Sequence, residues 1–230
     1  MVKNNQSTFF EFKNESGEGN FSISEFKGWN GSLIIKLDIP KNLTIKDDLI
    51  ISKHFDILNK EKIIVVTQGE IDFKLNNKSF LLKEFDAVNL FSNNSKYEIK
   101  SLVDSQIYII SAENLKPQKK DPIFFNFFED IVPKDIWGGQ CISRVFYGEC
   151  LNIVLFDLKP GFKFHDEGHE NEQITWVVKG EMDFYAKDLK KKLQPGTGVD
   201  IGGYDLHGGI SNGAIGFDVF YPKRNEKKYK

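Results

Sequence analysis

The chain has 230 residues, of which 40% are hydrophobic and 28% are charged, a composition typical of a folded globular protein. Its net charge of −2 argues against nucleic acid as a partner, because phosphate binding requires an extended basic surface. We expect a cytoplasmic protein with reduced thiols and no membrane partner. The sequence has only two cysteines, no secretory leader and no apolar run long enough to cross a bilayer.

Two stretches of the chain occur twice in the same order. The apolar run 33–40 is echoed at 152–160. The stretch 65–73, which joins two apolar segments through a Gly-Glu pair, is echoed at 176–184. Period-2 alternation dominates both halves, and helical periodicity is nearly absent. The sequence therefore predicts an all-β chain made of two similar, tandem barrels.

Turn-forming residues and one apolar segment define the boundaries of these units. Asn76-Asn77 and Lys187-Asp188 are predicted hairpin tips. The polar stretch 116–122 reads as an exposed linker, and the following run 123–128 is too apolar to remain in water. We expect 123–128 to pack between the two barrels or to add an edge strand. The predicted organisation is an N-terminal barrel at 1–115, a linker and connecting segment at 116–135, and a C-terminal barrel at 136–230.

Three of the four histidines lie in the second half with the spacing of a metal site. Glu167, His169 and Gln173 are two and four residues apart, so on an extended strand they would point to one face, and His207 would join them from a neighbouring strand. Imidazole and carboxylate ligands suit zinc, iron, manganese, cobalt or nickel equally well. We predict one divalent metal ion bound by these four residues. Glu172, out of phase with Gln173, is expected to face solvent.

The first ligand has two candidates. His165 lies two residues before Glu167 and would take its place if 166–168 form a bulge, because Gly168 permits the backbone angles that bulges need. Spacing from Gly161 favours Glu167, whereas ligand chemistry favours His165. The residue that does not bind the metal would lie beside it or act as an acid or base. His165 and Glu167 are therefore also the candidate catalytic residues.

The first half lacks this ligand set. Aligning the halves on their Gly-Glu pairs places other residue types at the four metal positions, namely Asp56, Leu58, Lys62 and Lys96. Only the aspartate could hold a cation, so the N-terminal barrel is predicted to have no metal and to serve as a scaffold. Its two lysines could instead hold an anionic ligand. His54 has no partner at ligand spacing and is predicted to be an ordinary polar residue.

These residues resemble the cupin superfamily, and the whole chain looks like a bicupin, a protein with two cupin barrels. The first cupin motif is Gly-x5-His-x-His followed by Glu or Gln and then Gly, and the second is Gly-x5-Pro-x-Gly-x2-His-x3-Asn. The second half matches them at Gly161, His169, Gln173, Gly180, Gly196 and His207. It departs from them at Glu167, Gly202, Tyr204 and Ser211.

Two short strings, 171–174 and 220–225, are most similar to the C-terminal half of the bicupin isomerase of bacilysin biosynthesis. The His-Gln-His set is also similar to cupins that open unsaturated uronate rings. The resemblance implies a divalent metal used as a Lewis acid, in an isomerase or lyase that stabilises the enolate of a small acidic metabolite. A non-catalytic binding or sensor protein and an iron-dependent dioxygenase are the alternatives. A monomer or a homodimer fits the resemblance.

Overall fold

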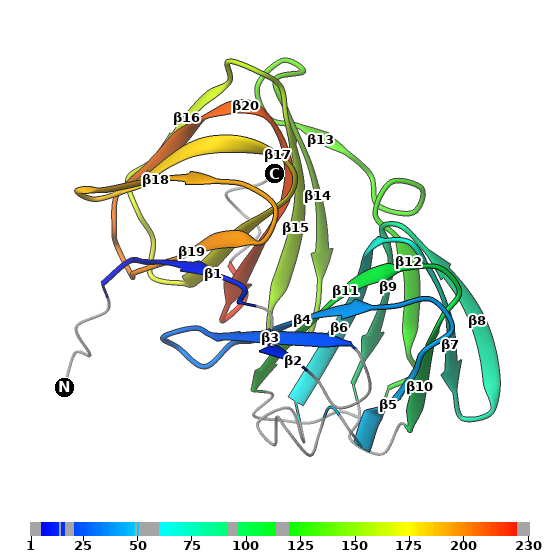
Figure 1. Ribbon diagram of the computed structural model, residues 1–230. Helices are drawn as coiled ribbons and strands as arrows, with labels where there is room; N and C mark the ends of the chain where they lie inside the picture. The colour runs from blue at the N-terminus through cyan, green and yellow to red at the C-terminus, as the bar shows by residue number, and fades with distance from the viewer. Residues whose placement is uncertain are drawn as a thin grey trace. The chain divides into compact units, whose positions relative to one another are not determined.

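The computed structural model describes residues 6–13, 15–16, 21–48, 50, 60–91, 96–113 and 120–224. These residues form two compact units (Figure 1). The C-terminal unit consists of the described residues of 1–11, 28–30 and 131–230, and the N-terminal unit consists of those of 12–27 and 31–130. No described helix is both long enough and apolar enough to span a bilayer.

The C-terminal unit is a nine-stranded antiparallel sheet that curls around its own core (Figure 1). Its strands are β1 (Thr8–Glu11), β13 (Lys134–Asp135), β14 (Cys141–Tyr147), β15 (Asn152–Leu158), β16 (Lys163–Asp166), β17 (Glu172–Ala186), β18 (Leu189–Leu193), β19 (Thr197–Ile201) and β20 (His207–Tyr221). The strand order is β1-β19-β17-β20-β15-β14-β13, with β18 paired to β17 and β16 paired to β20.

Two long strands, β17 and β20, give this unit its curvature. They pair with each other along most of their length, and their register shifts between Val177 and Lys179 and again between Gly180 and Met182. Such irregularities bend a strand, so each strand takes part in two portions of the sheet. The first part of β17 pairs with β19 and the second part with β18. The two portions enclose a core that includes Phe184.

The N-terminal unit contains two sheets (Figure 1). The seven-stranded sheet has the order β12-β9-β6-β11-β4-β3-β2, and the four-stranded sheet has the order β5-β10-β7-β8. The strands are β2 (Glu15–Ser16), β3 (Ser22–Lys27), β4 (Leu33–Ile39), β5 (Thr44–Lys46), β6 (Lys60–Gln68), β7 (Glu70–Leu75), β8 (Lys78–Lys83), β9 (Asp86–Leu90), β10 (Tyr97–Ser101), β11 (Ser105–Glu113) and β12 (Ile123–Asn126).

The two units share one strand order. In each, seven strands are arranged in the same way, so that β12, β9, β6, β11, β4, β3 and β2 correspond to β1, β19, β17, β20, β15, β14 and β13. The repeated apolar runs fall on β4 and β15, and the repeated Gly-Glu segments fall on β6–β7 and β17. The predicted all-β fold with an internal repeat is therefore confirmed.

The edge strands differ from the predicted boundaries. Residues 8–11 were expected in the N-terminal barrel, yet β1 pairs with β19 of the C-terminal unit. The apolar run 123–128 supplies β12, which is the edge strand of the N-terminal unit. Phe10 lies opposite Gly198 and Phe125 lies opposite Ala87, so each aromatic ring faces a small residue. Residues 116–119 of the predicted linker lie outside the described residues.

The hairpin predictions are confirmed. Asn76 and Asn77 both have positive φ, 49° and 68°, between β7 and β8, and Lys187 has φ of 51° between β17 and β18. Asparagine adopts this region more readily than other non-glycine residues, which explains the paired asparagines at the first tip. Cys141 and Cys150 are not joined in a disulfide.

Candidate metal site in the C-terminal unit

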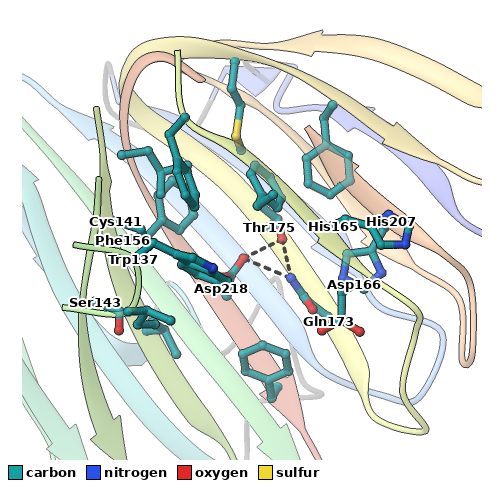
Figure 2. Close-up of a pocket in the computed structure, with 18 of the residues that line it drawn as sticks. Trp137, Cys141, Ser143, Phe156, His165, Asp166, Gln173, Thr175, His207 and Asp218 are labelled. Atoms are coloured by element: carbon teal, nitrogen blue, oxygen red, sulfur yellow. Dashed lines mark hydrogen bonds between the residues drawn. The ribbon is translucent and has the colours of Figure 1, made fainter. Parts of the chain in front are cut away.

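A cavity of about 130 Å³ lies inside the C-terminal unit (Figure 2). Apolar side chains such as Phe156, Phe162 and Met182 form part of its lining. The ionisable and amide side chains on the lining are Cys141, His165, Asp166, Gln173, His207, Asp218 and Arg224. Pockets for drug-sized ligands have volumes of roughly 300–1,000 Å³, so this cavity suits a smaller molecule.

His169 and Gln173 are in direct contact. His169 Nε2 lies 2.8 Å from Gln173 Oε1. The Gln173 amide donates from Nε2 to Thr175 Oγ1 at 3.1 Å and to Asp218 Oδ1 at 3.2 Å (Figure 2). Its oxygen is therefore the atom that contacts His169. His169 therefore donates its Nε2 proton to Gln173. Burial lowers the pKa of His169 to about 4, with the charge of Arg224 adding to the effect, and the ring is neutral at pH 7.

His207 lies beside His169, with the two ring centroids 5.5 Å apart. Its Nδ1 lies 2.8 Å from the backbone oxygen of Asp205, and only the histidine can be the donor in this bond. Burial lowers the pKa of His207 below its usual value, so the ring is neutral near pH 7. Nε2 of the neutral ring therefore carries a lone pair, which is the form that binds metals.

Glu167 lies apart from this trio, whereas His165 lies near His207 on the paired strand β16 (Figure 2). The Glu167 side chain is 84% exposed and is not part of the cavity lining, whereas His165 lines the cavity and is 47% exposed. The two contact each other, with 2.9 Å between His165 Nε2 and Glu167 Oε1, and Tyr185 OH lies 2.7 Å from His165 Nδ1. The structure thus brings His169, Gln173 and His207 together and leaves Glu167 outside.

The backbone explains the position of Glu167. The alternation argument required an extended strand, but β16 ends at Asp166 and β17 begins at Glu172. Gly168, between them, has φ of +97°, and a Cβ there would lie 2.6 Å from the backbone of Tyr204. A glycine is therefore required at this close approach, and the side chain before it no longer follows the inward alternation.

Sequence reasoning missed three charged residues on the cavity lining. Desolvation raises the pKa of Asp218 to about 6, although Thr175 and Gln173 both donate to its carboxylate. Burial opposes ionisation of Asp166, but hydrogen bonds from the Gly168 amide and Arg224 outweigh it and hold its pKa at about 2. Arg224 Nη2 lies 3.2 Å from Asp166 Oδ2. For Asp218 a signal existed, since it interrupts an otherwise apolar run on β20.

The separation of His169 and Gln173 is compatible with two ligands of one divalent ion. Two donors about 2.1 Å from one ion and at right angles to each other lie about 3 Å apart, close to the His169–Gln173 separation of 2.8 Å. Binding at His169 Nε2 requires its proton to move to Nδ1, which is buried and has no other partner. Among the described residues, however, no three His, Cys, Asp or Glu side chains are grouped closely enough to hold a metal. The site thus depends on Gln173.

The corresponding position of the N-terminal unit holds a lysine. Lys62 pairs with Leu90 as Gln173 pairs with Ile201, which agrees with the sequence alignment of the two halves. Lys62 is 3% exposed, and desolvation lowers its pKa to about 8, with the charge of Asp47 opposing this shift. Lys96 is exposed. His54, Asp56 and Leu58 lie outside the described residues.

Comparison with known proteins defines the fold. No protein-family model matches the sequence, and no curated protein matches it. Solved structures do match. Protein Ylba from E. coli superposes with a TM-score of 0.75 at 15% identity, over 98% of this chain and 95% of its own. A cupin 2 conserved barrel domain protein from Leptotrichia buccalis gives 0.63 at 12% identity, over 90% and 91%.

The chain has the cupin fold. A third cupin-fold neighbour, oxalate decarboxylase from Bacillus subtilis, gives a TM-score of 0.71 at 9% identity, over 96% of this chain and 78% of its own, and that enzyme contains Mn(II) centres. The fold expected from the resemblance is therefore confirmed. At identities of 9–15%, these likenesses concern the fold and not the reaction.

Proposed function

We propose that the C-terminal unit binds one divalent metal ion through His169, Gln173 and His207 and acts on a small acidic metabolite by enolisation, as an isomerase or lyase. The observation that carries the proposal is the tautomer of His207. Its Nδ1 proton is committed to the Asp205 carbonyl 2.8 Å away, so Nε2 offers a lone pair inside the unit. Three protein ligands leave coordination positions for a substrate.

A bound divalent ion would supply Lewis-acid polarisation of a substrate carbonyl or carboxylate. The chain's own residues supply the proton chemistry. Tyr185 would pass its hydroxyl proton to His165 Nδ1, 2.7 Å away, while its oxygen takes the proton removed from the substrate. His165 Nε2 continues to donate to the Glu167 carboxylate. His165 can therefore hold the proton relayed through Tyr185 without losing either contact.

Metal binding is tested with a matched pair of glutamine variants. Loss of a residue that only hydrogen-bonds to a metal ligand weakens metal binding by roughly 10- to 100-fold. Gln173→Ala removes a proposed ligand itself and is expected to weaken Co²⁺ binding by more than this. His207→Ala should act in the same way. The exposed Gln194 is the control, and Gln194→Ala should bind like the unaltered protein. Titration of metal-free protein, monitored by Co²⁺ absorption, measures the affinities. Equal affinities of the two glutamine variants would contradict the proposal.

His165 and Glu167 are expected to affect the reaction and not the metal. His165→Gln and Glu167→Gln should each leave Co²⁺ affinity within a few-fold, because neither side chain is one of the three proposed ligands. Loss of general acid–base catalysis should slow exchange of substrate C–H protons with D₂O by about 10²- to 10⁴-fold in His165→Gln. A large loss of metal affinity in Glu167→Gln would instead identify Glu167 as a ligand.

A non-catalytic binding protein is the second candidate. It is favoured by the exposure of Glu167, which leaves only neutral side chains in the trio. Purified protein without metal, together with small-acid binding that is unaffected by chelator, would support this candidate over the enzyme.

A further inference from the structure

Asp205 is a buried carboxylate whose two oxygens have different partners. Its residue is 2% exposed. Oδ1 lies 2.5 Å from Nζ of Lys187, and Oδ2 accepts from the backbone N–H of Ser7 at 3.2 Å and from the Ser7 hydroxyl at 2.8 Å. Because a buried carboxylate is costly unless its oxygens are hydrogen-bonded, these contacts hold Asp205 in place.

Ser7 contacts both ends of the turn that precedes β20. Its hydroxyl oxygen accepts from the Gly202 backbone N–H at 3.0 Å while its hydroxyl hydrogen is donated to Asp205. The same turn is closed by the Asp205 N–H, which donates to the Gly202 carbonyl at 3.0 Å. One buried hydroxyl thus bridges the two ends of this turn.

The turn at 202–205 also orients His207, because the backbone carbonyl of Asp205 accepts a hydrogen bond from His207 Nδ1 at 2.8 Å. Ser7 is itself fixed by the strand that follows it, since β1 pairs with β19 over Thr8–Glu11. The Phe10 ring lies over Gly198, where a Cβ would come within 2.4 Å of it. An unbroken series of contacts therefore runs from the N-terminal strand to the imidazole of His207.

We propose that Ser7 is a positioning residue for the metal site: through Asp205 it holds His207 in the orientation and tautomer that present Nε2. This role of Ser7 rests on the proposed function, in which His207 Nε2 binds the metal ion. The consequence is that the beginning of the chain helps to build a site whose ligands all lie in its last third.

Two hydroxyl deletions in adjacent residues provide the test. Ser7→Ala removes the bridging hydroxyl but keeps the backbone bond to Asp205, and Thr8→Val removes an exposed hydroxyl that donates to the backbone oxygen of Gln6. In the metal-free full-length protein, ¹⁵N NMR of the His207 ring should show the Nδ1–H tautomer in wild type and Thr8→Val. In Ser7→Ala it should show a mixture of tautomers, and Ser7→Thr should restore the single form.

Co²⁺ titration is the second measurement. Ser7→Ala is expected to bind Co²⁺ about 10- to 100-fold more weakly than Thr8→Val, the size typical for the outer partners of metal ligands. A purely structural role would lower the thermal midpoint without changing the His207 tautomer, and that result would overturn the proposal. If even wild type does not bind Co²⁺, the metal function fails, while the NMR result still decides the role of Ser7.

Discussion

Gly180→Ala is expected to destabilise the protein by more than about 4 kcal/mol, a loss seen only when a substitution has a specific structural cause. Gly180 lies on β17 with φ of +71°, and a Cβ at this position would lie 1.8 Å from the backbone oxygen of Gly213 on β20. Neither group is a side chain that can rotate away. The clash can therefore be relieved only by separating the two long strands that form the unit's longest pairing.

Gly196→Ala is the control for this prediction. Gly196 also matches a glycine of the cupin motifs and has φ of +87°, but a Cβ there would meet nothing within 4 Å. Alanine at this position is disfavoured only by the left-handed backbone conformation, which should lower the stability of the protein by about 1–2 kcal/mol. Urea unfolding of both variants measures the difference. A Gly180→Ala protein as stable as Gly196→Ala would mean that the strands can separate locally at little cost.

The internal repeat made the fold predictable, but it did not reveal which unit each edge strand joins. Phe9-Phe10 and Phe124-Phe125 have the same local pattern, and each precedes one barrel in the chain. Local pattern predicts that a strand forms and not where it pairs. The choice depends on the opposing strands, where Gly198 and Ala87 leave room for an aromatic ring. Contacts between residues so far apart in sequence have no local signal.

The proximity of His169, Gln173 and His207 could be predicted from the motif that they match, whereas the environment of the neighbouring acidic residues could not. The alternation that places Gln173 inside places Glu172 outside, and Glu172 was expected to face solvent. That expectation is wrong, since Glu172 is completely buried. Its carboxylate accepts a hydrogen bond from the Asn30 N–H at 2.5 Å. Asn30 belongs to residues 28–30, a distant segment of the chain that is part of the C-terminal unit. An outward face is exposed only if no distant segment covers it.

The buried Glu172 has a carboxylate neighbour, and this pair leads to the second large prediction. Burial and then the charge of Glu172 raise the pKa of Asp200 to about 8, while the Trp29 N–H, which donates to Asp200 Oδ2 at 3.1 Å, partly opposes the shift. The other oxygen, Oδ1, is buried and has no hydrogen-bond partner among the described residues. At neutral pH Asp200 is therefore predominantly protonated in the folded protein.

The N-terminal unit contains the same arrangement with an amide. Asn89 pairs with Ile63 as Asp200 pairs with Ile174, so Asn89 and Glu61 correspond to Asp200 and Glu172. There the Asn89 amide donates to the Glu61 carboxylate at 2.8 Å, and both residues are completely buried. Asparagine at position 200 would place a donor toward Glu172 and keep an oxygen for the Trp29 N–H.

Asp200→Asn is therefore expected to stabilise the protein, and increasingly so as the pH rises. An unfolded aspartate has a pKa near 4, so between about pH 4 and 8 the folded state binds the Asp200 proton more tightly than the unfolded state. Stability of the unaltered protein consequently falls across this range as the pH increases. At pH 8.5 the variant should be more stable by on the order of a few kcal/mol, and its thermal midpoint several degrees higher.

Asp183→Asn is the control for this prediction. Asp183 is exposed, so the substitution removes one charge without affecting a buried carboxylate, and it should change stability little at any pH.

The advantage of Asp200→Asn should disappear near pH 4, where Asp200 is protonated in the folded state and about half protonated in the unfolded state. An advantage that is independent of pH would show that the gain comes from the new hydrogen bond alone. A variant less stable than the unaltered protein at pH 8.5 would show that Asp200 is not held protonated. If the stability gain of Asp200→Asn grows with pH, the buried pair Asp200–Glu172 lowers the stability of the C-terminal unit. The corresponding pair in the N-terminal unit, Asn89–Glu61, avoids this cost because one member is an amide.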